Sequence, residues 1–172
     1  KGDLLIKNFD PKLIKTELNI LKKVGAKIKL FKNSIHVKGP KKIKSIRNIT
    51  TKEYPGFPTD LAPQFMVLLC KASGTSSITE NIFQGRFLHA MELQRLGAKI
   101  TIKNRTAKIE GNTNFIAAEV MSSDLRASAA LVLAGIVSKG NTVVTRVYHC
   151  DRGYENFENK LKKIGVKIKR LK

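Results

Sequence analysis

The chain has 172 residues and a formal net charge of +20, with 33 Lys and Arg residues against 13 Asp and Glu residues. This length suits about one domain with its own core, and no apolar run reaches the roughly 18 residues that a membrane-spanning helix needs. Cys70 and Cys150, the two cysteines, have neither metal-ligand nor disulfide-framework spacing. We therefore expect a cytoplasmic protein without a metal site, a secretory signal or a membrane span.

The positive charge favours an anionic partner, which leaves nucleic acid, a membrane surface and phosphorylated small molecules as candidates. Aromatic residues make up only 6% of the chain, and the lysines are spread along it rather than gathered in blocks. Base-stacking surfaces need aromatic side chains near basic ones, so a nucleic-acid-binding module is kept only as an alternative.

The first predicted helix follows a strand-like run, "DLLIKN", and covers "DPKLIKTELNILKKV". Asp10 is expected to cap it, because a carboxylate accepts hydrogen bonds from the free N–H groups of a first turn, and Pro11 suits the first helical position. Ile14 and Leu18 lie on one face at helical spacing. Gly25 supplies the left-handed conformation that ends a helix.

The end of this helix is repeated twice more. "LKKVGAKIKL" at 21–30, "LQRLGAKITI" at 93–102 and "LKKIGVKIKR" at 161–170 are nearly the same ten letters, about 70 residues apart. Each is predicted to end a helix at its glycine and to begin a strand, because lysines alternate with aliphatic residues afterwards. This spacing is typical of one supersecondary unit used several times.

The segments upstream of these repeats also match one another. Gly2, Gly74 and Gly140 each precede a β-like run. Before two of them stand "TDLAPQFMVLLCKASG" at 59–74 and "SDLRASAALVLAGIVSKG" at 123–140, which begin with a Thr-Asp or Ser-Asp pair suited to capping. Both predicted helices are apolar almost all round, which is typical of buried helices.

These patterns predict an α/β fold of three βαβαββ-type units, with apolar helices inside and lysine-bearing sheets outside. We place the units at residues 1–52, 53–111 and 112–172. The first unit lacks its leading strand and buried helix. We therefore expect the chain to be part of a longer protein whose N-terminal domain is absent here.

Arginines occupy matched places in the second and third units. When the units are aligned on Thr79 and Thr145, Arg86 and Arg152 coincide, each just ahead of an amphipathic helix, while Arg126 begins a buried helix. Guanidinium groups bind carboxylate and phosphate at two points, and helix N-termini add N–H donors, so the three arginines would form an anion pocket. A solvated or ion-paired role is the simpler interpretation for any one of them.

Structural roles are also open for the other polar residues. Asp60 and Asp124 suit N-cap positions as well as catalysis. His89 is expected on the surface of an amphipathic helix, and Cys70 in the core. Cys150, beside Asp151 and Arg152, fits a small half-buried residue better than an activated thiolate.

Four longer motifs carry a resemblance: "YPGFPTDLAPQF", "ENIFQGRFLHAMELQRLGA", "SSDLRASAALVLAG" and "YHCDRGYENFENKLKKIG". With them the chain resembles the C-terminal part of the UDP-N-acetylglucosamine 1-carboxyvinyltransferases over essentially its whole length. The enzymes that act on shikimate 3-phosphate share this fold, and a domain of that kind is the second alternative. "YPGFPTD" and "HCDRGYE" resemble the sugar-nucleotide enzymes instead.

The resemblance implies an inside-out α/β barrel in each of two domains, and no cofactor. It implies that the whole enzyme moves enolpyruvate from phosphoenolpyruvate to the 3′-hydroxyl of UDP-N-acetylglucosamine, the first committed step of peptidoglycan synthesis. The two substrates and the N-terminal domain are then the expected partners, with no nucleic acid or membrane.

The resemblance also implies residue roles. Asp60 is implied as the general base that also holds the sugar, and Asp124 as a neighbour of the reacting carbon, with Arg152 as the third catalytic residue. The implied substrate contacts are Asp60, Ile82, Arg86, Arg126 and Arg152.

One part of the family's machinery is missing from this sequence. The proton donor of the family is a cysteine or aspartate on a loop of the other domain, and neither Cys70 nor Cys150 occupies that place. We therefore expect the 172-residue chain alone to be inactive.

Overall fold

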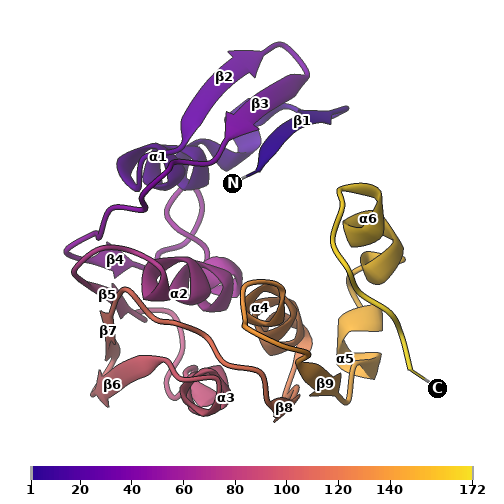
Figure 1. Cartoon of the computed structure of the whole chain (residues 1–172). Helices are drawn as coiled ribbons and strands as arrows, with labels where there is room; N and C mark the ends of the chain where they lie inside the picture. The colour runs from indigo at the N-terminus through magenta and orange to yellow at the C-terminus, as the bar shows by residue number, and fades with distance from the viewer. Residues whose placement is uncertain (1, 172) are drawn as a thin grey trace.

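The structure is a computed structural model that describes residues 2–171, so Lys1 and Lys172 lie outside the described part (Figure 1). Its best-formed unit follows the predicted order of strand, buried helix, strand, amphipathic helix and two strands. The elements of this unit are β4 (Ile49–Thr50), η2 (Thr59–Leu61), α2 (Ala62–Cys70), β5 (Thr75–Thr79), α3 (Leu88–Arg95), β6 (Lys99–Lys103) and β7 (Thr106–Glu110).

The strands of this unit form one four-stranded sheet in the order β4-β5-β7-β6. β4 is parallel to β5, and the other two pairs are antiparallel. β4 precedes residue 53, where the sequence predicted this unit to begin, yet it pairs with β5. The division of the chain into three units at the predicted boundaries stays a prediction.

The flanking units repeat parts of this pattern. Residues 3–38 form the antiparallel sheet β1-β3-β2, and residues 119–145 form the parallel pair β8-β9. Their elements are β1 (Asp3–Lys7), η1 (Pro11–Ile14), α1 (Lys15–Lys23), β2 (Lys27–Phe31), β3 (Ser34–Lys38), β8 (Glu119–Met121), α4 (Leu125–Ile136), β9 (Val143–Thr145), α5 (Tyr148–Asp151) and α6 (Phe157–Lys163).

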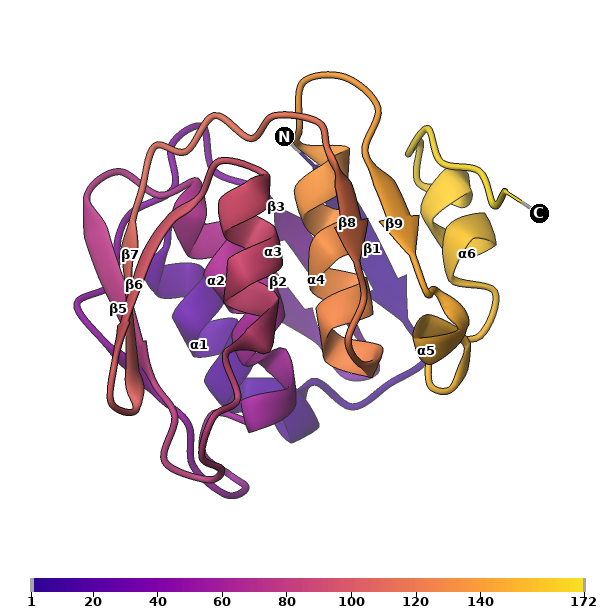
Figure 2. The ribbon, with the colours of Figure 1, turned by 90° about the horizontal axis from the view of Figure 1, so that it is seen from below.

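The apolar helices lie inside and the sheets outside, as predicted. α2 and α4 pack against each other in the middle, with the sheets around them (Figures 1 and 2). Met66 and Leu69 of α2 and Ala130 and Leu131 of α4 are fully buried. Because α4 presents small alanines, the two helices can approach closely and hold their N-terminal ends in a fixed relation.

Local signals at the helix ends are confirmed. The Asp10 carboxylate accepts a hydrogen bond from the Lys12 N–H at 2.9 Å, and Pro11 begins the η1 turn that leads into α1. Gly25, Gly97 and Gly165 all have φ values near +90° to +106°, the left-handed region that favours glycine. The three matching ten-letter segments therefore end their helices in the same way.

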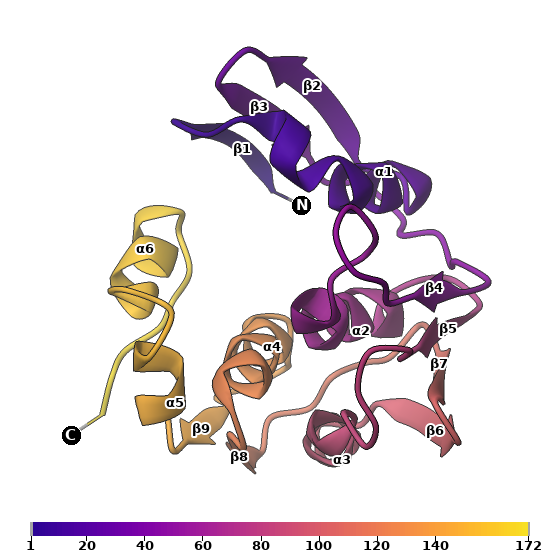
Figure 3. The same cartoon turned by 180° about the vertical axis from the view of Figure 1, so that it is seen from behind.

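The strand predicted within 161–170 is wrong. β2 and β6 each pair with the strand that follows them, whereas residues 166–171 form neither helix nor strand. The Arg170 guanidinium instead donates to both carboxylate oxygens of Asp151, at 2.9 and 2.6 Å. This ion pair holds the last described residues against α5. Both α5 and α6 lie on the opposite side of α4 from the sheet formed by β4, β5, β6 and β7 (Figure 3).

Candidate active site

Three side chains from separate elements meet at the N-terminal ends of α2 and α4. Arg86 comes from the loop between β5 and α3, and its Nη1 lies 3.3 Å from Oδ1 of Asp60 in η2. Nη1 of Arg126, in the first turn of α4, lies 3.6 Å from the same oxygen. The Asp60 side chain is 71% exposed, against 27% for Arg86 and 21% for Arg126. A mostly exposed carboxylate is thus paired with two largely buried guanidinium groups.

Asp124 caps α4, one of the two roles that the sequence left open. Its Oδ1 accepts hydrogen bonds from the backbone N–H groups of Arg126 at 2.9 Å and Ala127 at 3.2 Å, and from Nε of Arg126 at 3.0 Å. Burial alone would raise the pKa of Asp124, but these N–H donors and the Arg126 charge outweigh it and hold the pKa below its usual range. Asp124 is therefore a carboxylate at neutral pH, and it fixes the direction of Arg126.

The capping role predicted for the Thr59–Asp60 pair is wrong. η2 begins after Pro58, and no side chain caps it or α2. Asp60 lies within the turn rather than at its cap position, and its carboxylate forms ion pairs with Arg86 and Arg126. Thr59 points inward, where its hydroxyl accepts a hydrogen bond from Nη1 of Arg86 at 3.0 Å.

A buried carboxylate that the sequence did not single out supports this arrangement. Glu80, at the end of β5, is 2% exposed. Its Oε1 accepts hydrogen bonds from the Thr51 hydroxyl at 2.9 Å and from the N–H groups of Ile82 at 2.7 Å and Phe83 at 3.0 Å. Its Oε2 accepts one from the Thr59 hydroxyl at 2.6 Å. Glu80 thereby joins the end of β4, the η2 turn and the loop that carries Arg86.

The charge of Glu80 is stabilised by these donors. Burial alone would raise its pKa, but the hydrogen bonds from Thr59, Phe83, Thr51 and Ile82 outweigh burial, and the pKa of Glu80 lies below its usual range. A chain of contacts runs from Glu80 through Thr59 to Arg86 and on to Asp60. The only signal in the sequence is an acidic residue at a strand end, which does not identify its partners.

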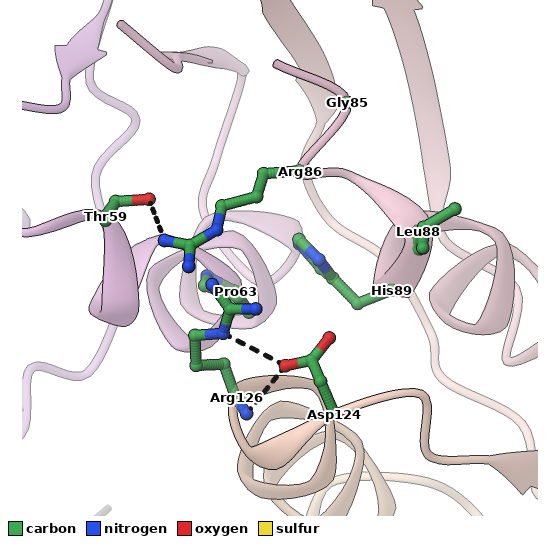
Figure 4. Close-up of a pocket in the computed structure, with 8 residues that line it drawn as sticks. All are labelled: Thr59, Pro63, Gly85, Arg86, Leu88, His89, Asp124 and Arg126. Atoms are coloured by element: carbon green, nitrogen blue, oxygen red, sulfur yellow. Dashed lines mark hydrogen bonds and ion pairs between the residues drawn. The ribbon is translucent and has the colours of Figure 1, made fainter. Parts of the chain in front are cut away.

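A small cavity of about 70 Å³ lies beside these groups (Figure 4). The side chains of Arg86, Arg126, His89 and Asp124 converge on it in Figure 4. Its lining residues are Thr59, Pro63, Gly85, Arg86, Leu88, His89, Asp124 and Arg126. Two cations and one carboxylate in a partly enclosed space are suited to binding an anion.

The prediction that His89 lies on the helix surface is wrong. α3 packs against α4, so the face of α3 that bears His89 is turned inward, and the side chain is only 4% exposed. Burial lowers the pKa of His89 to about 4, against the opposing effect of the Asp124 charge. The imidazole is therefore neutral at physiological pH.

Arg152 and Ile82 stand apart from this cluster. Arg152 follows α5 and is exposed, and its guanidinium group makes no hydrogen bond or ion pair within residues 2–171. Its neighbour Gly153 lies against Leu125, close enough that an added Cβ would be 2.9 Å from a Leu125 methyl carbon. Arg152 thus lies next to the start of α4 without lining the cavity, and the half-buried Ile82 donates its N–H to Glu80.

The sequence profile of EPSP synthase, also called 3-phosphoshikimate 1-carboxyvinyltransferase, matches residues 1–161. The chain belongs to the EPSP synthase family. Among curated members it is 60% identical over 171 residues to the UDP-N-acetylglucosamine 1-carboxyvinyltransferase of Pelagibacter ubique and 51% identical to that of Desulfosudis oleivorans. Each match covers 99% of this chain and 41% of the relative, so the chain spans about two fifths of the relatives' length.

Two solved structures share the fold of this chain. The enolpyruvyl transferase NikO from Streptomyces tendae superimposes with a TM-score of 0.90 at 23% identity, over 98% of this chain and 40% of NikO. An EPSP synthase from Acinetobacter baumannii gives a TM-score of 0.77 at 19% identity, over 99% of this chain and 43% of that one. The resemblance drawn from the four motifs and the fold that it implied are both confirmed.

The two cysteines of this family member do not supply a reactive thiolate. Cys70 is fully buried, and burial raises its pKa to about 12. Burial likewise raises the pKa of Cys150. Among residues 2–171, no group of three or more His, Cys, Asp or Glu side chains is placed to hold a metal ion. None of the helices in that range is long and apolar enough to cross a membrane.

Proposed function

We propose that this chain forms one wall of the active site in a longer UDP-N-acetylglucosamine 1-carboxyvinyltransferase, an enzyme of peptidoglycan synthesis in the cytoplasm. The observation that carries the proposal is the meeting of Asp60, Arg86 and Arg126 beside one cavity. The names of relatives at 60% and 51% identity support this choice of substrates.

The proposed reaction is an addition followed by an elimination. The 3′-hydroxyl oxygen of UDP-N-acetylglucosamine forms a bond to C2 of phosphoenolpyruvate, the hydroxyl gives up its proton, and C3 gains one. The C2–O bond to phosphate then breaks, C3 loses a proton, and the double bond returns. Inorganic phosphate and the enolpyruvyl ether are the products.

Asp60 is the proposed base for the first step, and it also holds the sugar. A general base must be within hydrogen-bond reach of the proton that it removes, and the 71% exposure of Asp60 leaves its carboxylate open to an incoming hydroxyl. Ile82, on the loop fixed by Glu80, is proposed to contact the nucleotide sugar.

Arg86, Arg126 and Arg152 are proposed to bind phosphoenolpyruvate, with Asp124 beside the reacting carbon. Fixed cations stabilise the negative charge that develops on carboxylate, phosphate and alkoxide in the transition state. Arg86 and Arg126 already face one cavity. Arg152 would join them when the substrate is bound, from its position beside the start of α4.

The proton that C3 gains is proposed to come from the remainder of the longer protein. Cys70 and Cys150 are buried thiols with raised pKa values, so neither is suited to the role. The N-terminal part would form the opposite wall and exclude water. We accordingly expect the 172-residue chain alone to release no phosphate.

The test is phosphate release by the full-length gene product with both substrates. Asp60→Ala should lower kcat by about 100-fold or more, the range attributed to a general base. Asp10→Ala is the matched control, since Asp10 caps η1 and its side-chain hydrogen bond comes from Lys12, which is not a proposed site residue. Undiminished turnover in Asp60→Ala would remove Asp60 from the role of base.

A second substrate choice comes from the family profile, which is named for 3-phosphoshikimate. The acceptor decides between the two. If shikimate 3-phosphate supports phosphate release and UDP-N-acetylglucosamine does not, the chain belongs to an enzyme of the shikimate type.

A further inference from the structure

His89 carries a buried polar atom that nothing in the described part of the chain satisfies. It is the second residue of α3, and within residues 2–171 its Nε2 is buried and has no hydrogen-bond partner. Most buried polar atoms in proteins are hydrogen-bonded, so such an exception calls for an explanation. The other buried side-chain atom without a partner there, the Thr142 hydroxyl, does not line the cavity.

The surroundings of His89 indicate what would satisfy it. The ring lies between Arg86 and the Asp124–Arg126 pair and lines the same cavity (Figure 4). The two guanidinium groups favour an anion there. A neutral imidazole with the proton on Nε2 offers one donor to such an anion, and it adds no third positive charge to be desolvated.

We propose that His89 donates a hydrogen bond from Nε2 to the anionic group that binds between Arg86 and Arg126. The ligand chemistry is a carboxylate or phosphate oxygen. This rests on the proposed function, in which the group belongs to phosphoenolpyruvate. His89 is then a substrate-binding residue that the four motifs did not reveal.

For His89→Leu in the full-length protein, the proposal predicts weaker binding of phosphoenolpyruvate without a loss of stability. Removing an unsatisfied buried nitrogen should leave the melting temperature unchanged or raise it, because an apolar side chain of similar size needs no partner. The same variant should raise the KM for phosphoenolpyruvate about tenfold, the worth of one hydrogen bond, and change the KM for the acceptor much less.

Two further variants sharpen the test. His89→Gln keeps an N–H donor at a similar reach and should recover much of the affinity for phosphoenolpyruvate. His36→Leu makes the same chemical change at a histidine on β3, which is half-buried and paired with Asp3. It should leave both KM values unchanged.

The proposal is overturned if His89→Leu keeps the wild-type KM for phosphoenolpyruvate. It is also overturned if the variant loses stability and activity together and His89→Gln restores neither, because that pattern indicates a structural role.

Calorimetric titration separates this proposal from the proposed function. If the wild-type protein shows no enolpyruvyl transfer, inorganic phosphate and pyruvate are titrated into wild type and His89→Leu. Weaker binding of either anion by the variant supports the His89 contact and identifies phosphate or carboxylate as its partner. Equal binding, or no binding by the wild type, overturns the contact whatever the reaction proves to be.

Discussion

Glu80 and His89 are both almost completely buried, and His89 lines the cavity while Glu80 holds the lining residue Thr59. Glu80 is charged and accepts four hydrogen bonds, whereas the neutral His89 has a buried nitrogen with no partner in the described chain. Burying a polar group costs free energy unless it is hydrogen-bonded. The satisfied carboxylate therefore belongs to the framework, and the unsatisfied imidazole is available to a ligand.

The difference follows from where each side chain stands. Glu80 ends a strand, where the loop at 81–83 turns back and aims its N–H groups at the carboxylate. His89 lies in the first turn of α3, and its ring faces a cavity instead of another segment. The framework group should thus govern stability, while the other should govern binding.

The largest expected effect is that of Glu80→Ala on stability. Four donors would lose their acceptor and a buried space would open, so the free energy of unfolding should fall by about 3 kcal/mol or more. Urea unfolding followed by circular dichroism measures this. If the free energy of unfolding fell by less than about 1 kcal/mol, Glu80 would not hold the end of β4, the η2 turn and the loop at 81–83 together. The contrast between Glu80 and His89 would then fail.

A smaller effect is expected for Glu80→Gln, and it depends on pH. The pKa of Glu80 in the folded protein lies below the unfolded value of about 4.3, so its stabilisation is present above that value and is lost as pH falls through the folded pKa. Wild type should exceed Glu80→Gln by about 1–2 kcal/mol at pH 7.

That gap should narrow as the pH falls below about 4.3 and through the folded pKa of Glu80. Unfolding in urea across this range checks the trend. A gap that stays constant with pH would mean that the charge of Glu80 is not what its donors stabilise.

The smallest expected effect distinguishes two threonines that both hydrogen-bond to Glu80, one that only supports the fold and one that also contacts Arg86. Thr51→Val and Thr59→Val each remove one hydroxyl that donates to Glu80, and each should cost about 1 kcal/mol of stability. Only Thr59 also accepts from Arg86. Thr59→Val alone should therefore raise the KM for phosphoenolpyruvate, by a few-fold, in the full-length protein. Equal kinetic effects of the two variants would contradict this separation.

Features set by neighbours along the chain were predictable from the sequence. The apolar helices, the glycines that end helices and the cap at Asp124 all depend on local geometry, and each is confirmed. Arg86 and Arg126 were expected together as part of a pocket of three arginines, but Arg152, the residue that the repeat aligns with Arg86, does not line the cavity.

Features set by distant segments were not predictable. The burial of His89 depends on α4 packing against α3, and the role of Glu80 depends on threonines about 20 and 30 residues away. The strand expected at 166–170 failed for the same reason, since a strand needs a partner that period-two alternation does not supply. The catalytic role of Arg152 stays a prediction.

One consequence follows from the residues that line the cavity, since they include the opening turns of three helices: Pro63 of α2, His89 of α3 and Arg126 of α4. The peptide dipoles of a helix sum to about half a positive elementary charge at its beginning. Three such ends aimed at one small volume create an electrostatic field that no single side-chain replacement can abolish. Some attraction for anions should therefore persist even when either guanidinium is removed.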